Sequence, residues 1–212
     1  IYRTLLEKNI EKMINKFFYK LYLLLLINII SSNHKLTLEE IYLDLKINKT
    51  IMSPGASIYP YAPSDGDTSI IAEEFNVVSV GKNILGKEIF LSKKCATSWL
   101  KMQQAALNDS ITISVLSGFR SYYKQYLIVR NKLNKGMELD SILKENRLPG
   151  LSQHHSGNAI DIISNSYKLS TEFEKSSAYS WLNKNAHKYG FYLQYPKANN
   201  RGIIFEPWHW YF

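Results

Sequence analysis

Ser152-Gln-His-His-Ser-Gly-Asn-Ala-Ile-Asp161 and Glu206-Pro-Trp-His209 are the two strings of this sequence that constrain its structure most strongly. They supply two imidazoles, a carboxylate to accompany them, and a second carboxylate in Glu206. Two imidazoles and one carboxylate, with a coordination position left open for water, form the ligand set of a catalytic zinc site. The two strings therefore predict a zinc hydrolase.

The spacing within the strings explains how the candidate ligands could meet. In a predicted strand over 159–163, side chains alternate between faces, and a charged Asp161 among apolar residues needs a metal or an arginine as partner. Gly157 would let the chain bend back so that His154 and Asp161 face one point. His209 would then complete the site from the last strand.

Glu206 is predicted to lie near the metal without binding it. Pro207 argues against a continuous helix through Glu206 and His209, so an extended or turned backbone is expected. From there Glu206 could take a proton from metal-activated water and pass it to a leaving amine. Trp208 is interpreted as packing or as a wall of the cleft, and His155 and His187 are given no role.

Composition limits the function classes that need to be considered. The chain has 212 residues, of which 45% are hydrophobic, so it can bury a core. Its single cysteine, Cys95, excludes an intramolecular disulfide and a cysteine-rich zinc site. The net charge of +8 comes from scattered Lys and Arg without a nucleic-acid motif. General attraction to a polyanionic surface such as a bacterial wall or anionic lipid is the preferred explanation.

The chain is predicted to have three segments. Residues 1–33 run from basic to apolar to small polar residues, as in a signal peptide, with an uncleaved membrane anchor or a core helix as alternatives. Residues 34–70 are expected to hold a short helix at 38–47, introduced by a capping box, and then a linker. Residues 71–212 are assigned to the catalytic domain.

Within the catalytic domain, strands and helices mix without regular βαβ alternation, which favours an α+β fold. Strands are predicted at 77–80, 89–91, 111–116, 159–163, 191–193 and 202–205. Helices are predicted from the Ser92 cap to about 107, at 121–133, at about 139–146, and from a capping box at 171–174 to Gly190.

The chain resembles the zinc D-alanyl-D-alanine carboxypeptidases of the VanY type, in the peptidase M15 group, which also includes L,D-carboxypeptidases. Beyond the two opening strings, the similar segments are Ser117-Gly-Phe-Arg-Ser-Tyr-Tyr-Lys-Gln125, Pro149-Gly150, Trp181-Leu-Asn-Lys-Asn-Ala186 and Tyr189-Gly-Phe191. The resemblance covers roughly residues 75–212.

The resemblance implies a role for each matching residue. The zinc ligands would be His154, Asp161 and His209, and Glu206 would be the catalytic base. Arg120 would hold a substrate carboxylate or stabilise the oxyanion. The substrate pocket would be lined by Gln125, Ser117 and Ser152.

The fold implied by the resemblance is a small antiparallel sheet flanked by helices, shared with the hedgehog signalling domain. That domain type can hold zinc without enzyme activity, so fold alone does not imply catalysis. The chain departs from many relatives at Gln194, where an arginine is frequent, which could alter the charge preference for substrate.

The leading functional hypothesis is a zinc carboxypeptidase that trims the terminal D-alanine from peptidoglycan stem peptides in a bacterial envelope or periplasm, or after secretion. A monomer is expected, with membrane attachment through the N-terminal segment as an option. An L,D-carboxypeptidase, a peptidoglycan endopeptidase and a non-catalytic wall-binding module are the alternatives. Nucleic-acid binding is not expected.

Overall fold

A four-stranded antiparallel sheet in the order β3-β4-β6-β5 forms the centre of the fold. The computed structural model describes residues 69–164 and 169–212, so the predicted signal segment and the helix at 38–47 lie outside the described residues. The four strands are β3 (Ser114–Ser117), β4 (Ala159–Ile163), β5 (Tyr192–Leu193) and β6 (His209–Tyr211). The described part confirms the α+β class with a small antiparallel sheet.

The register of this sheet places three polar residues in one row. Ser117 of β3 lies opposite Asp161 of β4, and Asp161 lies opposite His209 of β6. Residues directly opposite each other on neighbouring strands project to the same face of a sheet. The chain thus brings Asp161 and His209 together although they are far apart in sequence.

A second, two-stranded sheet pairs β1 (Val77–Lys82) with β2 (Glu88–Ser92). It leads directly into α3 (Lys93–Asn108), whose N-cap Ser92 accepts a hydrogen bond from the backbone N–H of Cys95, as the sequence predicts. The α3 helix packs on both strands of this small sheet.

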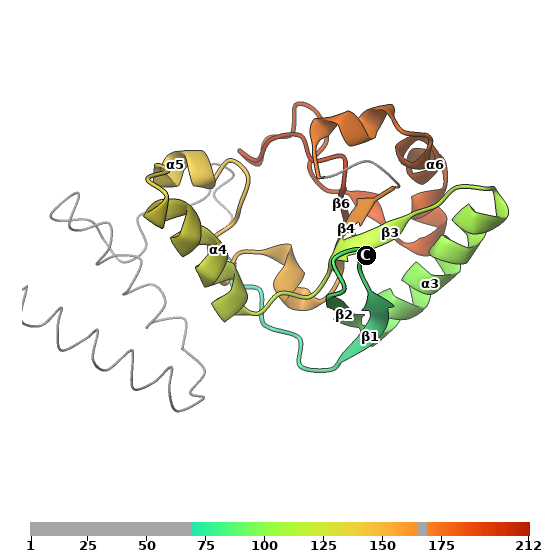
Figure 1. The fold of residues 1–212 in the computed structure, drawn as a ribbon, viewed down its shortest axis with the longest axis horizontal. Helices are drawn as coiled ribbons and strands as arrows, with labels where there is room; N and C mark the ends of the chain where they lie inside the picture. The colour runs from blue at the N-terminus through green and yellow to red at the C-terminus, as the bar shows by residue number, and fades with distance from the viewer. Residues whose placement is uncertain (1–68, 165–168) are drawn as a thin grey trace, which may run out of the picture. The chain divides into compact units, whose positions relative to one another are not determined.

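The remaining helices lie at two ends of the central sheet (Figure 1). At one end are α4 (Tyr122–Asn134) and α5 (Leu139–Ile142), and at the other are α3 and α6 (Ser177–Asn185). Short 3-10 helices occupy Gln153–Ser156, Thr171–Lys175 and Ala186–Tyr189. Gly190 follows the last of them with a positive φ of 82°, as predicted for a residue that ends a helix.

The apolar core lies where the sheet meets α3 and α6. Its largest fully buried side chains include Trp99 and Met102 of α3, Ile160 and Ile162 of β4, and Phe191. Removing these side chains from water supplies the main driving force for folding. The sheet is therefore held from its apolar face, which leaves the row of polar residues available for chemistry.

The structure corrects three predicted elements. Gly202–Phe205 is not a strand, although Ile203 is buried, and the last strand is β6. The predicted helix at 139–146 ends at Ile142. The helix expected after the capping box at 171–174 is divided, because a 3-10 helix ends at Lys175 and Ser176 then caps α6.

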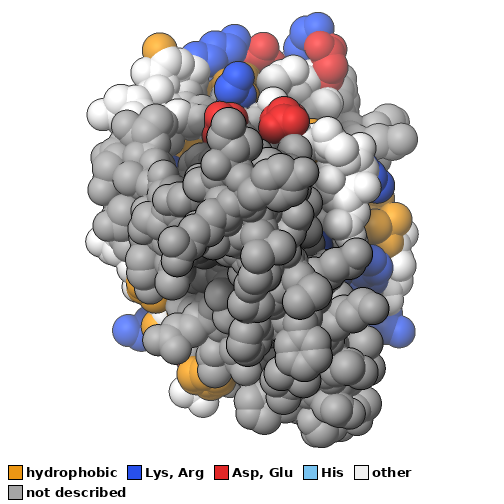
Figure 2. Space-filling model, turned by 90° about the vertical axis from the view of Figure 1, so that its left-hand side faces the viewer, with side chains coloured by type: hydrophobic (Ala, Val, Ile, Leu, Met, Phe, Trp, Pro, Cys, Tyr) orange, Lys and Arg blue, Asp and Glu red, His pale blue; other side chains and the backbone are white. Residues whose placement is uncertain are grey.

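Two features of the structure concern the expected polyanionic and membrane partners: the distribution of charged side chains on the surface and the hydropathy of the helices. On the face viewed in Figure 2, basic and acidic side chains lie next to one another along the upper edge. Within residues 69–164 and 169–212, none of the helices has both the length and the hydropathy required to span a bilayer.

Candidate metal centre

His154, Asp161 and His209 form a buried cluster, with one potential ligand atom of each lying within 4.8 Å of the others. His154 Nε2 is 3.3 Å from Asp161 Oδ2, and His209 Nδ1 is 3.0 Å from Asp161 Oδ1. Zinc bonds of roughly 2.0–2.1 Å in a tetrahedron place ligand atoms about 3.3 Å apart. The separations of both imidazole nitrogens from the Asp161 carboxylate are therefore close to those around a tetrahedral metal.

His154 is oriented by a hydrogen bond from its second nitrogen. Its Nδ1 lies 2.7 Å from the backbone carbonyl oxygen of Gly118. A carbonyl can only accept, so Nδ1 carries the hydrogen and Nε2 keeps its lone pair. Hydrogen bonds of this kind are typical of metal-binding histidines, because they fix the tautomer and the ring orientation.

Close backbone packing at Gly157 places the His154 turn against β2. Gly157 has φ of +68°, and a Cβ built on it would lie 2.8 Å from the backbone nitrogen of Ser92. Ser92 N–H also donates to the Gly157 carbonyl at 2.9 Å. Glycine is therefore required for the left-handed conformation, which allows the bend that the sequence suggested, and also for the close approach to Ser92, which was not predicted.

Glu206 lies beside the cluster and outside it. Its Oε2 is 4.0 Å from His209 Nδ1, while the backbone N–H of His209 donates to the Glu206 carbonyl to close a turn. The predicted turned backbone between these residues is thus present. The arrangement suits a carboxylate that acts on a proton near the metal rather than one that binds the metal.

Arg120 is oriented by two of the residues that the sequence singled out. Its Nη1 donates to Gln125 Oε1 at 2.8 Å, and its Nη2 donates to Ser117 Oγ at 3.0 Å. Nη2 also lies 3.7 Å from Asp161 Oδ2. These two bonds use two of the five N–H groups of the guanidinium, so donors remain for a further acceptor.

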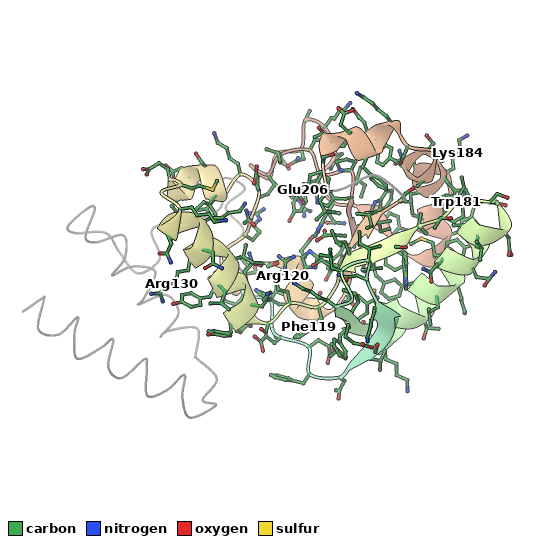
Figure 3. All side chains as sticks on the ribbon, viewed as in Figure 1. Phe119, Arg120, Arg130, Trp181, Lys184 and Glu206 are labelled. Carbon is green, nitrogen blue, oxygen red and sulfur yellow. The ribbon has the colours of Figure 1, made fainter. Side chains whose placement is uncertain are left out.

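A cleft of about 280 Å³ opens over these groups. Its lining includes Arg120, Glu206, Ser152 and the three cluster residues, and Trp208 forms part of its wall, as expected. Figure 3 labels Arg120 and Glu206 in the central part of the unit, away from Trp181 and Lys184 at the α6 end. Ser117 and Gln125 are not among the lining residues, and Gln125 is fully buried behind Arg120.

Burial and neighbouring charge set the protonation states of the cluster. Burial lowers the pKa of His154 to about 4, so its imidazole is neutral at pH 7. Burial alone would raise the pKa of Asp161, but His154 and His209 outweigh it and hold that pKa well below its usual range. A neutral imidazole and an ionised carboxylate are the forms that bind a metal.

Glu206 has the opposite tendency. Burial, and then the nearby charges of Asp161 and Glu145, raise the pKa of Glu206 to about 9, against the opposing effects of Arg120 and Arg147. In the metal-free molecule, Glu206 is therefore a protonated acid at neutral pH. A bound cation reverses such a shift, because it stabilises the charged carboxylate.

No role was expected for His155 from the sequence, and the structure assigns one. His155 is fully buried, with Nδ1 2.6 Å from the Arg120 carbonyl and Nε2 accepting from the Gly150 N–H at 3.0 Å. It thereby ties the Arg120 loop to the Pro149-Gly150 turn. Other cleft-lining residues without a sequence-based role include Gln153, Tyr195 and Arg147. Gln153 could have been suspected, because it lies between two motif positions.

The donor set fits zinc. It offers two imidazole nitrogens and one carboxylate, all buried and close together, with Glu206 kept apart from them. Three protein ligands leave the fourth tetrahedral position free, as in catalytic rather than structural zinc sites.

Comparison with known proteins gives a consistent assignment over the region that holds the site. Residues 88–212 match the family described as VanY: D-alanyl-D-alanine carboxypeptidase. The chain is 35% identical over 126 residues to the YodJ protein of Bacillus subtilis (strain 168), covering 57% of this chain and 45% of that protein. It is 32% identical over 133 residues to a D-alanyl-D-alanine carboxypeptidase of Enterococcus faecium, covering 61% and 39% respectively.

Among solved structures, the LdcB LD-carboxypeptidase has 30% sequence identity and a TM-score of 0.60, with 66% of this chain and 69% of that chain covered. The chain spans less than half the length of the two relatives compared by sequence. The similarity therefore concerns the unit that carries the cluster and the cleft.

Proposed function

The chain belongs to the VanY family of D-alanyl-D-alanine carboxypeptidases, and on that basis we propose that it is a zinc-dependent carboxypeptidase that removes the C-terminal D-alanine from peptidoglycan stem peptides. The observation that carries the proposal is the meeting of the His154, Asp161 and His209 cluster with Glu206 and Arg120 in one cleft. The cluster alone could serve a structural metal, whereas a separate buried carboxylate and a cleft-lining guanidinium are what hydrolysis requires.

Each residue in the cleft has a distinct part in the proposed reaction. Zinc held by the three ligands would supply a Lewis acid and lower the pKa of water to about 7. Glu206 would accept a proton from the attacking water at its carboxylate and donate it to the leaving amine of D-alanine. Its position near His209, but outside the ligand cluster, supports this role.

Arg120 would bind the free carboxylate at the C-terminus of the stem peptide or stabilise the developing oxyanion. Ser117 and Gln125 accept hydrogen bonds from its guanidinium, which lowers the cost of ordering it on binding. A planar guanidinium can donate two parallel hydrogen bonds to a carboxylate, and this gives a carboxypeptidase its preference for chain ends. Ser152 lines the same cleft and would contact the peptide beside the scissile bond.

An L,D-carboxypeptidase activity is the second candidate, and the similarity to the LdcB structure favours it. The two activities would use the same cluster, base and guanidinium, and would differ in the configuration of the residue before the scissile bond. Cleft shape rather than the metal centre would decide between them.

Mass spectrometry of muropeptides tests both candidates. The full chain, loaded with zinc, is incubated with pentapeptide and tetrapeptide muropeptides, with and without a chelator. Chelator-sensitive loss of one alanine from the pentapeptide is expected. Loss from the tetrapeptide alone would assign the L,D activity, and an internal cut would assign an endopeptidase.

The Glu206→Gln variant tests the proposed base. It should lose turnover by a factor of about 10² or more, the contribution typical of general acid–base catalysis, while still binding zinc. Full activity in this variant would show that Glu206 is not the base.

We further propose that residues 71–212 form the catalytic domain and that the protein acts at the bacterial envelope, where its substrate occurs.

A further inference from the structure

A hydrogen-bonded chain of four side chains leads from Arg201 to one ring nitrogen of His209. Arg201 Nη1 donates to Gln194 Oε1 at 3.2 Å, and Gln153 Nε2 donates to the same oxygen at 3.2 Å. Gln153 Oε1 then lies 3.0 Å from His209 Nε2. His209 Nδ1 is on the other side of the ring, 3.0 Å from Asp161 Oδ1.

The donor-only guanidinium of Arg201 determines how the amides of Gln194 and Gln153 are oriented. A guanidinium has only donors, so the oxygen of the Gln194 amide must face Arg201. That oxygen also faces Gln153, which must turn its NH₂ group toward it. The Gln153 oxygen is then directed at His209, and Nε2 of the imidazole must carry the hydrogen.

From this geometry we propose that Gln153 and Gln194, aligned by Arg201, are positioning residues that fix the tautomer of His209 and present the Nδ1 lone pair to the metal. The inference rests on the proposed zinc-dependent function. The Gly118 carbonyl fixes the tautomer of His154 in the same way, which leaves Nε2 of His154 as its ligand atom. The two histidines therefore bind through different ring nitrogens, each selected by a hydrogen bond on the opposite side of the ring.

Arg201 is needed because the two amides do not fix their own orientation. A glutamine amide can rotate by half a turn and exchange its donor and acceptor ends at little steric cost. If both amides turned, Gln153 would present NH₂ to His209, and the hydrogen would move to Nδ1, where it would block the metal. Arg201 prevents this exchange because it cannot accept a hydrogen bond.

Zinc affinity, measured on the full chain by competition with a chromophoric chelator, tests the proposal without relying on activity. Gln153→Met removes the acceptor at similar side-chain length and should weaken zinc binding by about 10–100-fold. Gln153→Glu keeps an oxygen acceptor for His209 but loses the donor to Gln194, so it should bind zinc more tightly than Gln153→Met. Gln103→Met is the matched control, because Gln103 of α3 is also half-buried and its Nε2 donates to the Ile113 carbonyl.

Arg201→Met tests whether the cation acts through the amides. The variant should weaken zinc binding by a smaller factor, about 2-fold, since one of two amide orientations remains competent. Added to Gln153→Met, it should cause no further loss, because residues that act through one another are not additive. Independent, additive losses would overturn the part assigned to Arg201.

Imidazole ¹⁵N NMR of the zinc-loaded wild type reads the tautomer directly and needs no variant. His209 should show a protonated Nε2 and a metal-bound Nδ1, and the reverse assignment would overturn the inference. If the wild type binds zinc tightly and Gln153→Met binds it equally well, the inference fails while the proposed function stands. If the wild type binds no zinc, both are overturned.

Discussion

At Glu206, the stability of the metal-free fold favours the protonated carboxyl, whereas the proposed chemistry requires the ionised carboxylate. Its pKa is raised to about 9 in the metal-free fold, mainly by burial, from an ordinary value of 4.5. Between these two values, the folded chain holds a proton that the unfolded chain has released. The free energy of unfolding of the metal-free protein should therefore decrease as pH rises from about 5 to about 9.

Replacing Glu206 by glutamine should remove this pH dependence. At pH 8, with a chelator present, Glu206→Gln should melt about 10 °C or more above the wild type, since the proton kept by the folded state costs about 1.4 kcal/mol for each pH unit above the ordinary pKa, and each kcal/mol shifts the melting temperature of a chain of this size by about 2–4 °C. At pH 4 the two proteins should melt together, because the carboxyl is protonated in both states. Differential scanning calorimetry at the two pH values measures this.

The exposed Glu172, which pairs with Lys175 on the surface, provides the control. Glu172→Gln should change the melting temperature by about 1 °C or less at either pH, because surface ion pairs contribute little. An equal rise in both variants at pH 8 would trace the effect to net charge rather than to the buried site.

Arg120 should not tolerate lysine, although the charge is kept. Lysine cannot donate two parallel hydrogen bonds in a plane, and it would leave Gln125 Oε1 and Ser117 Oγ without their partner. Arg120→Lys should lower kcat/KM for the pentapeptide by about 10–100-fold, the equivalent of one or two hydrogen bonds to a charged group. Steady-state kinetics measure the loss, and zinc content should match that of the wild type.

At the scale of elements, the turn that carries His154 depends on a single glycine. Gly157→Ala must adopt φ of +68° and place its Cβ 2.8 Å from the Ser92 nitrogen, at the junction of β2 and α3. Gly86 has a similar φ of +71° with no atom within 4 Å of the built Cβ, so it isolates the conformational cost. Gly86→Ala should cost about 1–2 kcal/mol, and Gly157→Ala about 2 kcal/mol more.

Denaturant unfolding of the two variants measures this difference, and zinc affinity gives a second readout. Only Gly157→Ala should also weaken zinc binding, because it moves the turn that supports His154. If the two alanine variants lost equal stability, the close approach to Ser92 would have no energetic importance.

The predicted elements show what sequence patterns can and cannot establish. Capping at Ser92 and Ser121 is encoded locally, so α3 and α4 begin where predicted. The apolar run at 202–205 was misinterpreted because apolar content indicates burial rather than strand pairing. Ile204 N–H instead donates to the Lys144 carbonyl, a partner that no local pattern identifies.

Residue types and motif spacing predicted the residues of the metal centre better than they predicted the helices and strands. The three candidate ligands and Glu206 were predicted from their chemistry, and the register of β4 with β6 explains why Asp161 and His209 meet. The residues behind them were not predicted. Gln153 lies 41 positions from its partner Gln194, and an amide in a loop has no sequence signature until the fold brings its partners together.

For the whole molecule, removal of the metal should weaken the fold without abolishing it. The apolar core between the sheet, α3 and α6 contains none of the three ligands, and the described strands remain paired through their backbones. Free zinc at about 100 times its dissociation constant should add about 2.7 kcal/mol of stability. For a chain of this size, chelation should therefore lower the melting temperature by about 5–10 °C.

Far-UV circular dichroism should keep its shape after chelation, while the melting temperature falls and returns when zinc is restored. Asp161→Asn is the matched control: it keeps the size of the side chain but loses the ionised ligand, so its melting temperature should no longer respond to zinc. Loss of the dichroism signal on chelation would instead identify the cluster as a structural metal site required for folding. In that case the free coordination position, and with it the argument for catalysis, would lose its support, because a folding metal is normally closed by four protein ligands.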